Sequence, residues 1–506
     1  MKLLDRLERY ASEKAEVCAF VNAAKNDCIT YGELKTRSDR LAGYILSLDL
    51  ERGEPVVVYG HKQSDMLTAF FGCVKSGHPY CPVDISMPSS RLADIIEVSG
   101  SRLLIAVEPT EITAETVLDR QTLEKITAAD GAECDKAARV SGDEVYYIIF
   151  TSGSTGKPKG VQITADCLDH FCEWIVTVGG EEQYEAHNTF LNQAPFSFDL
   201  SVMDVYASLF TGGTIWSLEK SVQGDFEALH DSLRKSGVTV WVSTPSFMNM
   251  CLLNKAFDQN MMPGLRRILF CGEVLPKQTA GELLRRFPLA KTVNTYGPTE
   301  STVAVTEIEI TKEMLEEESL SIGVPRSGSP IFIMQDHKPV PAGQRGELVI
   351  TGDTLAKGYL HQPELTKEKF ATLPIGGKDT RCYLTGDEGY YDEKGRLYYC
   401  GRIDFQLKLH GYRIELGDIE NNVMQDESVR HCVVLPIVKD GVNKALAAFI
   451  VPAVAVEDEF AFSQAIRKTL KQKLPEYMVP QKYVFLDKMP MTTNGKADRN
   501  TLKSMI

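Results

Sequence analysis

Short apolar runs alternate with amphipathic stretches over the first 400 or so residues of the chain. Runs of this kind predict buried strands, and five of them cover residues 55–60, 101–107, 145–150, 239–242 and 267–270. After the first run, apolar side chains recur at helical spacing, at Leu67, Phe70, Phe71 and Val74. Strands that alternate with helices favour mostly parallel sheets covered on both faces, which is an α/β fold.

The last hundred residues differ from the rest in charge. Residues 404–506 hold 14 Lys and Arg against 13 Asp and Glu, whereas the preceding 403 residues hold 41 against 56. This shift predicts a large lobe over residues 1–402 and a small C-terminal domain over residues 403–506. With 506 residues, 43% of them hydrophobic, the chain can bury more than one core.

Composition excludes several classes of protein. A net charge of −14 argues against a nucleic-acid binder, which would carry a basic surface. The 12 cysteines form no C-x-x-C pair, so neither a zinc site nor a thioredoxin-like motif is indicated, and reduced thiols are expected. The longest apolar run, residues 445–456, is shorter than the roughly 20 residues of a spanning helix. Asp5, Arg6, Glu8 and Arg9 lie where a signal peptide would need an apolar stretch. We therefore expect a cytoplasmic protein with no membrane insertion.

The segment 147–162, YIIFTSGSTGKPKGVQ, leads from a buried strand into glycines, hydroxyls and lysines. Glycines let a backbone approach a ligand closely, and exposed N–H groups, hydroxyls and lysines bind phosphate oxygens. The spacing is not that of a Walker loop, because Gly153 and Gly156 are three apart and Pro158 follows Lys157. A phosphate-binding loop is therefore indicated, although a flexible surface loop would have a similar composition.

This segment resembles the signature of the adenylate-forming enzymes, which include acyl-CoA synthetases, luciferases and the adenylation domains of nonribosomal peptide synthetases. Seven further segments resemble motifs of the family in the same order, and they span nearly the whole chain: residues 29–34, 74–84, 294–300, 346–360, 383–387, 401–420 and 490–499. The resemblance implies an α/β fold with a large N-terminal lobe of several subdomains and a small, mobile α+β C-terminal domain.

The family's chemistry joins a carboxylate to the α-phosphate of ATP, releases pyrophosphate, and passes the acyl group to a thiol. The resemblance implies an ATP site that consists of Thr151, Ser152, Asn294, Thr295, Tyr296, Gly297, Pro298, Thr299, Asp387, Tyr399, Arg402 and Lys496. In it, Tyr296 lies against adenine, Asp387 binds the ribose hydroxyls and Glu300 helps to hold Mg²⁺. Taken alone, Asp387 could equally be a turn residue and Tyr296 a core aromatic.

Two residues of the C-terminal domain receive roles from the resemblance. Lys496 follows the turn-forming pair Asn494 and Gly495, where a lysine is usually a solvated charge. In the family, the matching lysine bridges the substrate carboxylate and the α-phosphate, so we expect Lys496 to be catalytic. Asp404 matches the family's hinge, about which the small domain rotates between adenylation and thiol transfer.

The substrate is indicated by residues 198–201, FDLS, which resemble the amino-acid-activating branch of the family. There Asp199 would pair with the substrate ammonium, although by spacing alone Ser197 or Asp199 could be a helix N-cap. The other matched pocket positions are Leu200, Met203, Cys271 and Val303, with Lys496 at the carboxylate. Side chains of this size leave a small pocket that suits Ala, Gly or Ser.

Residues 269–275 and 404–420 resemble the branch of Gram-positive bacteria that loads D-alanine onto the phosphopantetheine thiol of a separate carrier protein, for teichoic acid esterification. Cys271 matches a cysteine that lies against the substrate α-carbon, although a buried cysteine is as often a small packed hydrophobe. An acidic carrier could dock on the basic helical face predicted for residues 465–475. The alternatives are an enzyme for another small amino acid, an acyl-CoA ligase, and an inactive relative, which should have lost Lys496 or Asp387.

Overall fold

The computed structural model describes residues 1–129, 134–152, 158–180, 187–403, 406–439, 442–491 and 497–506. Its contacts divide the chain into two units. The first comprises Met1–Asp84, Ser99–Ile149 and Gly160–Ile403, and the second Ile85–Val98, Phe150–Lys159 and Asp404–Ile506. The second unit therefore includes two segments from earlier in the chain, and the division into a lobe and a mobile domain at residue 402 stays a prediction.

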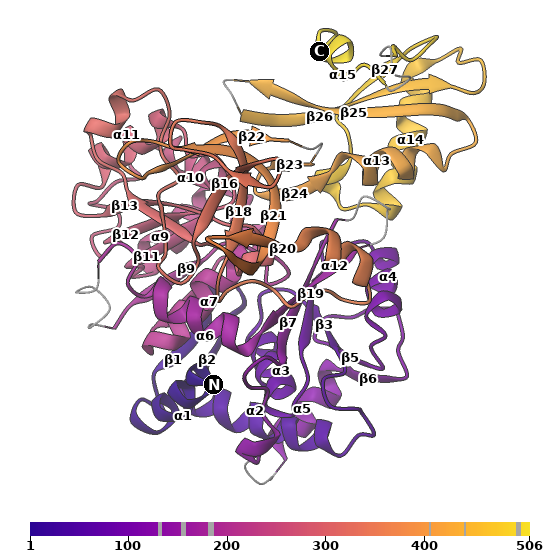
Figure 1. Ribbon diagram of the computed structural model, residues 1–506. Coiled ribbons are helices and arrows are strands. Elements are labelled where there is room, and N and C mark those ends of the chain that lie inside the picture. The colour runs from indigo at the N-terminus through magenta and orange to yellow at the C-terminus, as the bar shows by residue number, and fades with distance from the viewer. Residues whose placement is uncertain (130–133, 153–157, 181–186, 404–405, 440–441, 492–496) are drawn as a thin grey trace. The chain divides into compact units, whose positions relative to one another are not determined.

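A nine-stranded sheet forms one layer of the first unit (Figure 1). Its order is β15 (Val324–Pro325), β14 (Thr306–Glu309), β13 (Lys291–Tyr296), β12 (Arg267–Phe270), β11 (Val240–Ser243), β9 (Thr189–Asn192), β10 (Thr214–Ser217), β1 (Cys18–Asn22) and β2 (Asp27–Thr30). The strands from β13 to β1 are parallel, and the edge strands β2, β14 and β15 pair antiparallel. Two of the five predicted strands, β11 and β12, lie here.

A seven-stranded sheet contains the other three predicted strands, β3, β5 and β7. Its order is β19 (Gly358–Tyr359), β8 (Lys159–Thr164), β7 (Val145–Thr151), β4 (Tyr80–Asp84), β3 (Val56–Gly60), β5 (Leu103–Ala106) and β6 (Thr116–Asp119). The strands from β7 to β6 are parallel. The α/β fold with mostly parallel sheets is thereby confirmed.

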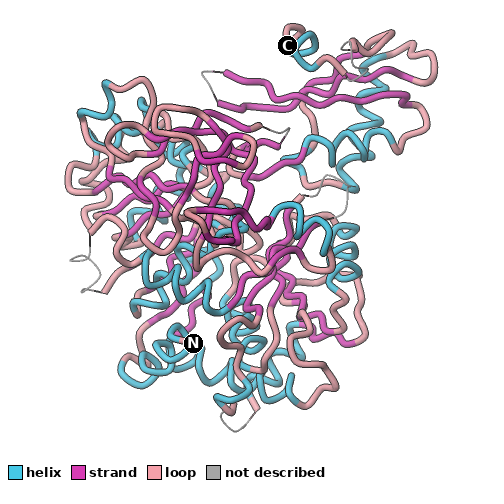
Figure 2. The backbone as a smooth tube through the Cα atoms, viewed as in Figure 1, coloured by secondary structure: helices cyan, strands magenta, loops and turns pink. Residues whose placement is uncertain are grey.

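Helices pack against these two sheets, cyan against magenta in Figure 2. They are α1 (Lys2–Glu13), α2 (Tyr31–Leu46), α3 (Ser64–Lys75), α5 (Arg120–Ala128), α6 (Ala165–Ile175), α7 (Leu200–Thr211), α8 (Lys220–Gln223), α9 (Phe226–Lys235), α10 (Pro245–Leu252), α11 (Lys277–Arg286) and α12 (Pro363–Lys369). Every residue of α3 is buried, and it contacts strands β1 and β2 of one sheet and β3 and β4 of the other. A helix buried on all sides belongs to the interior of the unit, where α3 joins the two sheets.

A third, antiparallel sheet has the order β17 (Lys338–Pro339), β16 (Ile331–Gln335), β18 (Gly346–Thr351), β21 (Lys378–Tyr391) and β20 (Phe370–Ile375), and β22 (Leu397–Arg402) also pairs with β21. In the ladder between β21 and β22, Asp387 lies opposite Arg402. Opposite residues of an antiparallel pair bring their side chains together, so this register places two predicted site residues in contact.

The second unit contains a hairpin, β23 (Gln406–Leu409) and β24 (Tyr412–Glu415), and a three-stranded sheet of β25 (Val429–Lys439), β26 (Val442–Pro452) and β27 (Lys482–Phe485). Its helices are α4 (Ser89–Ser99), α13 (Leu416–Met424), α14 (Glu459–Lys473) and α15 (Arg499–Lys503). Helix α14 covers most of the segment 465–475 for which a basic helical face is predicted; it buries Ile466 and Leu470 and leaves Lys468 and Lys471 exposed. A helix with an exposed basic face is thereby confirmed up to Lys473, where α14 ends.

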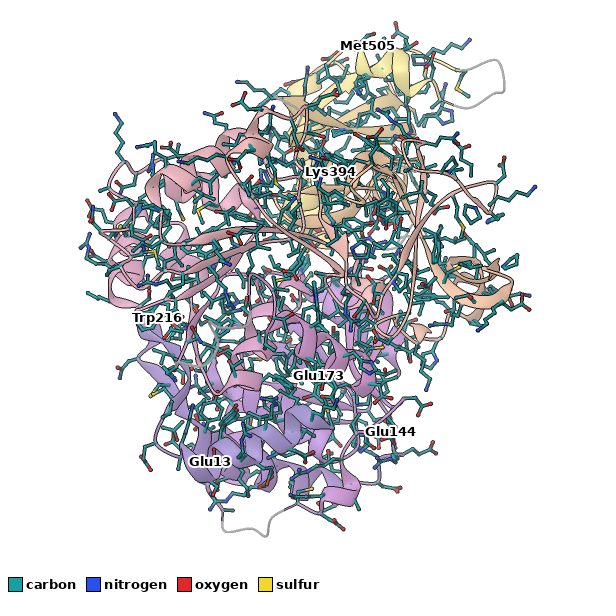
Figure 3. All side chains as sticks on the ribbon, turned by 60° about the vertical axis from the view of Figure 1, so that its left-hand side comes forward. Glu13, Glu144, Glu173, Trp216, Lys394 and Met505 are labelled. Atoms are coloured by element: carbon teal, nitrogen blue, oxygen red, sulfur yellow. The ribbon has the colours of Figure 1, made fainter. Side chains whose placement is uncertain are left out.

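Acidic side chains are common on the outside of the first unit. Figure 3 labels Glu13, Glu144 and Glu173, and each forms an ion pair with a Lys or Arg side chain. Exposed pairs of this kind contribute little to stability. The twelve cysteines are thiols that form no disulfide, and most of them are buried. Among the described residues, no helix is long and apolar enough to cross a membrane.

Candidate functional site

The predicted adenosine contacts begin in the last residues of β13, at the carboxyl end of a parallel strand. Binding sites of open α/β sheets form at such ends. Asn294 is buried and its Nδ2 donates to the Ser321 carbonyl at 2.9 Å. Thr295 Oγ1 donates to the Phe270 carbonyl at 2.8 Å. These bonds fix the backbone just before Tyr296.

Tyr296, Asp387 and Arg402 form one cluster. The Tyr296 hydroxyl donates to Asp387 Oδ2 at 2.5 Å, and Arg402 Nη1 donates to Asp387 Oδ1 at 3.0 Å. The same guanidinium nitrogen donates to the Thr385 carbonyl at 2.8 Å. The ring of Tyr399 lies 6.4 Å from that of Tyr296. Burial, and then the carboxylate of Asp387, raise the pKa of the Tyr296 phenol well above its ordinary value, so it stays a neutral donor.

The turn after Tyr296 leaves no room for a side chain at Gly297. A Cβ on Gly297 would lie 2.6 Å from the Ala304 Cα and 2.8 Å from the Val303 carbonyl oxygen. Thr302 and Val303 both have left-handed backbone, with φ of 60° and 70°. Such a conformation is strained for β-branched residues and is commonly found at functional sites. The close packing of Gly297 against Val303 and Ala304 therefore maintains the strained backbone of Val303, a predicted pocket residue.

Asp199 occupies the N-cap position of α7 but makes no side-chain capping bond. Its Oδ2 instead accepts a hydrogen bond from Thr299 Oγ1 at 2.6 Å. Because η4 (Thr299–Ser301) follows the β13 turn, this bond joins the predicted amino-acid contact to the predicted ATP contacts. Cys271, which follows β12, is buried and donates through Sγ to the Val303 carbonyl at 3.5 Å. The predicted pocket residues Asp199, Cys271 and Val303 are thus tied to the same turn.

Glu300 is fully buried, and its Oε1 accepts a hydrogen bond from the Tyr359 hydroxyl at 2.7 Å. A carboxylate is the kind of hard oxygen ligand that Mg²⁺ takes, usually together with phosphates and water. The described residues contain no group of three or more His, Cys, Asp or Glu that could hold a metal. The predicted role of Glu300 as a magnesium ligand stays a prediction.

In the second unit, Thr151 ends β7 and Ser152 follows it. Ser152 Oγ donates to the Arg413 carbonyl at 3.1 Å and accepts from the Glu415 N–H at 3.2 Å. Thr151 Oγ1 is buried and has no hydrogen-bond partner among the described residues. Lys496, Asp404 and residues 153–157 of the predicted phosphate loop lie outside the described residues. Their predicted roles stay predictions.

Sequence reasoning missed Tyr359, whose hydroxyl contacts the site residue Glu300, and the buried lysine Lys62, which bonds to Asn192 and Gln193. Tyr359 lies within the matched segment 346–360, so its position in that motif was an available signal. Lys62 is also missing from the predicted set, although it is fully buried beside β9. A lysine just before a helix normally indicates a solvated charge, so the sequence offers no signal for it.

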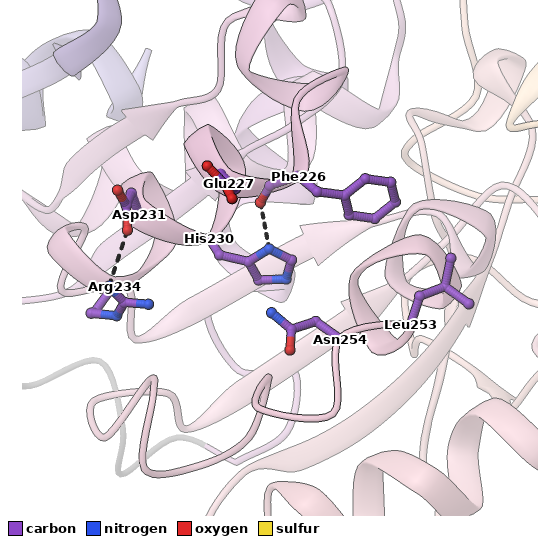
Figure 4. Close-up of a pocket in the computed structure, with 7 residues that line it drawn as sticks. All are labelled: Phe226, Glu227, His230, Asp231, Arg234, Leu253 and Asn254. Carbon is purple, nitrogen blue, oxygen red and sulfur yellow. Dashed lines mark hydrogen bonds and ion pairs between the residues drawn. The ribbon is translucent and has the colours of Figure 1, made fainter.

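A separate cavity of about 510 Å³ lies at the surface of the first unit, between α9 and the end of α10. Phe226, His230 and Leu253 are among its lining residues (Figure 4). The His230 Nδ1 bonds to the carbonyl of Phe226. None of the predicted site residues lines this cavity, so the candidate site does not lie there.

Comparisons with known proteins place the chain among enzymes of one kind. Residues 7–360 match the family of AMP-binding enzymes, and residues 418–496 match its C-terminal domain. The chain is 45% identical to a D-alanine–D-alanyl carrier protein ligase of Bacillus cereus (strain B4264) over 512 residues, which is 100% of both chains. It is also 45% identical to the ligase of the same name from Bacillus anthracis over 511 residues, again 100% of both.

Solved structures agree with this fold. A nonribosomal peptide synthetase protein that contains adenylation and PCP domains superposes with a TM-score of 0.83 at 27% identity, over 99% of this chain and 83% of that one. An o-succinylbenzoate CoA synthetase of Bacillus subtilis superposes with a TM-score of 0.84 at 20% identity, over 99% and 98%. At that identity the second likeness concerns the fold alone.

Proposed function

The chain belongs to the AMP-binding enzyme family, and from this premise we propose that it activates D-alanine with ATP and transfers it to a carrier protein. The first step forms D-alanyl-AMP and releases pyrophosphate, and the second forms a thioester with the phosphopantetheine of a separate carrier. The observation that carries the proposal is the 45% identity, over the whole chain, to ligases named for D-alanine and its carrier. The wider role would be to supply D-alanine for teichoic acids, with ATP drawn from the cytoplasm.

The Tyr296 cluster supports the nucleotide part of this proposal. Asp387 accepts hydrogen bonds from Tyr296 and Arg402, so its carboxylate is held between two donors. Ribose hydroxyls are donors as well, and an ordered carboxylate binds them without first having to become fixed. Tyr296, Tyr399 and Asn294 would face the adenine, and Arg402 would add positive charge next to the ribose.

Asp199 supports an amino acid as the acid that is activated. Its carboxylate, half-buried and already bonded to Thr299, would pair with the substrate ammonium. A fatty or aryl acid carries no ammonium to pair with this carboxylate, so it would gain nothing from the charge that the site has placed away from water. Leu200, Met203, Cys271 and Val303 are all buried and would leave space for a small side chain only.

Both partners of the first step are anions, so the site must supply positive charge. We assign this to Lys496, which would contact the substrate carboxylate and the α-phosphate, while Thr151 and Ser152 would bind the β- and γ-phosphates. Glu300 would hold Mg²⁺, which neutralises phosphate charge when bound. Asp404 would be the hinge that lets residues 403–506 exchange between the two half-reactions.

A carrier-loading assay tests the second half of the proposal. The enzyme is incubated with ATP, Mg²⁺ and D-alanine, together with either a phosphopantetheinylated D-alanyl carrier protein or free CoA, and products are measured by intact mass. We expect a D-alanyl thioester on the carrier and little D-alanyl-CoA. Equal or faster reaction with CoA would favour an acyl-CoA ligase, and loading of another amino acid would favour an enzyme for that substrate.

A further inference from the structure

Lys62 is a fully buried lysine at the carboxyl end of β3, in the seven-stranded sheet. Its Nζ donates to the Asn192 carbonyl at 2.8 Å, to Asn192 Oδ1 at 3.0 Å and to the Gln193 carbonyl at 2.8 Å. Asn192 ends β9 of the nine-stranded sheet, so the Lys62 side chain joins the carboxyl ends of two strands from different sheets. An ammonium has three N–H donors, and here each has an oxygen acceptor.

Asn192 extends the contact to helix α7. Its Nδ2 donates to Asp204 Oδ1 at 2.8 Å and to the Ala194 carbonyl at 3.2 Å, and its Oδ1 also accepts from Ser217 Oγ at 3.0 Å. Asp204 is fully buried and lies five residues after Asp199. These hydrogen bonds therefore reach both ends of the segment 193–199. Lys62 bonds to its first residue, Gln193, and Asn192 bonds to Asp204 in α7, the helix that follows the segment.

The charges around Lys62 favour the protonated form. Burial lowers the pKa of Lys62 to about 7, and Asp204, Asp84 and Glu219 oppose that decrease. An ammonium can donate to all three oxygens, whereas a neutral amine has two N–H donors and a lone pair, so this set of acceptors favours the ammonium. His61, the other titratable neighbour from the same loop, bonds through Nδ1 to Asp84.

A second buried lysine shows what a purely structural ion pair looks like in this protein. Lys75 in α3 donates to Asp39 Oδ1 at 2.6 Å and to Ser38 Oγ at 2.9 Å. Both partners lie in α2, Glu8 of α1 lies 3.9 Å from the same ammonium, and none of the three belongs to the candidate site. Lys62 differs because two of its acceptors are main-chain carbonyls at the start of the segment that carries Asp199.

We propose that Lys62 is a positioning residue for the amino-acid site, which with Asn192 fixes the segment 193–199 so that Asp199 meets the substrate ammonium. The inference depends on the role proposed above for Asp199. Thr299 fixes Asp199 itself, and Lys62 fixes the point where the segment leaves β9. Loosening that point would displace the carboxylate from the ammonium while the Tyr296 cluster keeps its own contacts.

The test measures ATP–pyrophosphate exchange in the full-length wild type and in the variants Lys62→Met, Asn192→Ala and Lys75→Met. Methionine keeps the length of lysine but donates no hydrogen bond, and Lys75→Met removes an equally buried ion pair elsewhere. We expect Lys62→Met and Asn192→Ala to raise the KM for D-alanine about 10- to 100-fold, the scale for small displacements of reacting groups. The KM for ATP should stay within about twofold in all variants, and Lys75→Met should leave both KM values within about twofold.

Equal changes in both KM values, or lower thermal stability with unchanged kinetics, would overturn the proposal. A similar rise of the KM for D-alanine in Lys75→Met would do the same. If Lys62→Met fails to fold, Asn192→Ala decides, since it keeps the lysine and removes the bridge to Asp204. A wild type that exchanges only with another amino acid would refute the proposed substrate instead, and the variants would then be measured with that amino acid.

Discussion

Gly297→Ala probes how closely the turn after β13 is packed around the site. The new Cβ would lie 2.6 Å from Ala304 Cα, where ordinary contact begins at 3.4 Å, so the backbone must move by about 0.8 Å. Overpacking of this kind costs about 1–3 kcal/mol. The displaced residues include Val303, whose carbonyl accepts from Cys271, and the turn also connects Tyr296 to Thr299. A displacement near 1 Å can cost roughly a hundredfold in rate, so we expect a loss of about 10- to 100-fold in kcat/KM for both substrates.

The matched control is Gly43→Ala. Gly43 lies inside helix α2, and a Cβ there meets no atom within 4 Å. Replacing a helix-interior glycine by alanine should stabilise the protein by about 1 kcal/mol and leave activity unchanged. Calorimetry gives the melting temperature of both variants, and pyrophosphate exchange gives their kcat/KM. Wild-type exchange kinetics and an unchanged melting temperature in Gly297→Ala would refute the argument that this turn has no room for a methyl group.

Three further predictions concern single side chains. Lys496→Ala should lower adenylation by about 10²–10³, the scale of one preorganised electrostatic contact, and single-turnover adenylate formation at the wild-type rate would contradict its role. Asp199→Asn should raise the KM for D-alanine roughly 10- to 100-fold, since a hydrogen bond to a charge contributes about 1.5–3 kcal/mol. An equal rise in the KM for ATP would argue against a specific contact. Burial raises the pKa of Asp418 in the folded protein to about 6. Because the folded state binds this proton more tightly than the unfolded state, the free energy of unfolding should fall by about 3 kcal/mol as pH rises from about 4 to 6. Denaturant unfolding at several pH values should show this decrease in the wild type and not in Asp418→Asn. An equal decrease in both proteins would contradict the prediction.

The strands of the parallel sheets could be predicted because their burial is local in the sequence. The runs at 145–150 and 267–270 are apolar at nearly every position, as expected for strands covered on both faces, and they form β7 and β12. The spacing of Leu67, Phe70, Phe71 and Val74 predicted α3 for the same reason. The sequence pattern did not predict the third sheet, from β16 to β22, whose strands are antiparallel.

The site was predictable from motifs, but its contacts were not. Asp387 and Arg402 are 15 residues apart, and only the register of β21 with β22 brings them together. The alternatives for Asp199, an N-cap or a pocket residue, could not be decided by spacing, because its carboxylate bonds to Thr299 from a distant strand end. The burial of Lys62 depends on contacts between two sheets, which no local pattern records.

The measurement that tests the central claim most directly is ATP–pyrophosphate exchange by the full-length enzyme with D-alanine, L-alanine, glycine and L-serine supplied one at a time. The proposed function predicts exchange with D-alanine at a kcat/KM well above that for each of the other three. A clear preference for any of the others, or no exchange that depends on an amino acid, would contradict it.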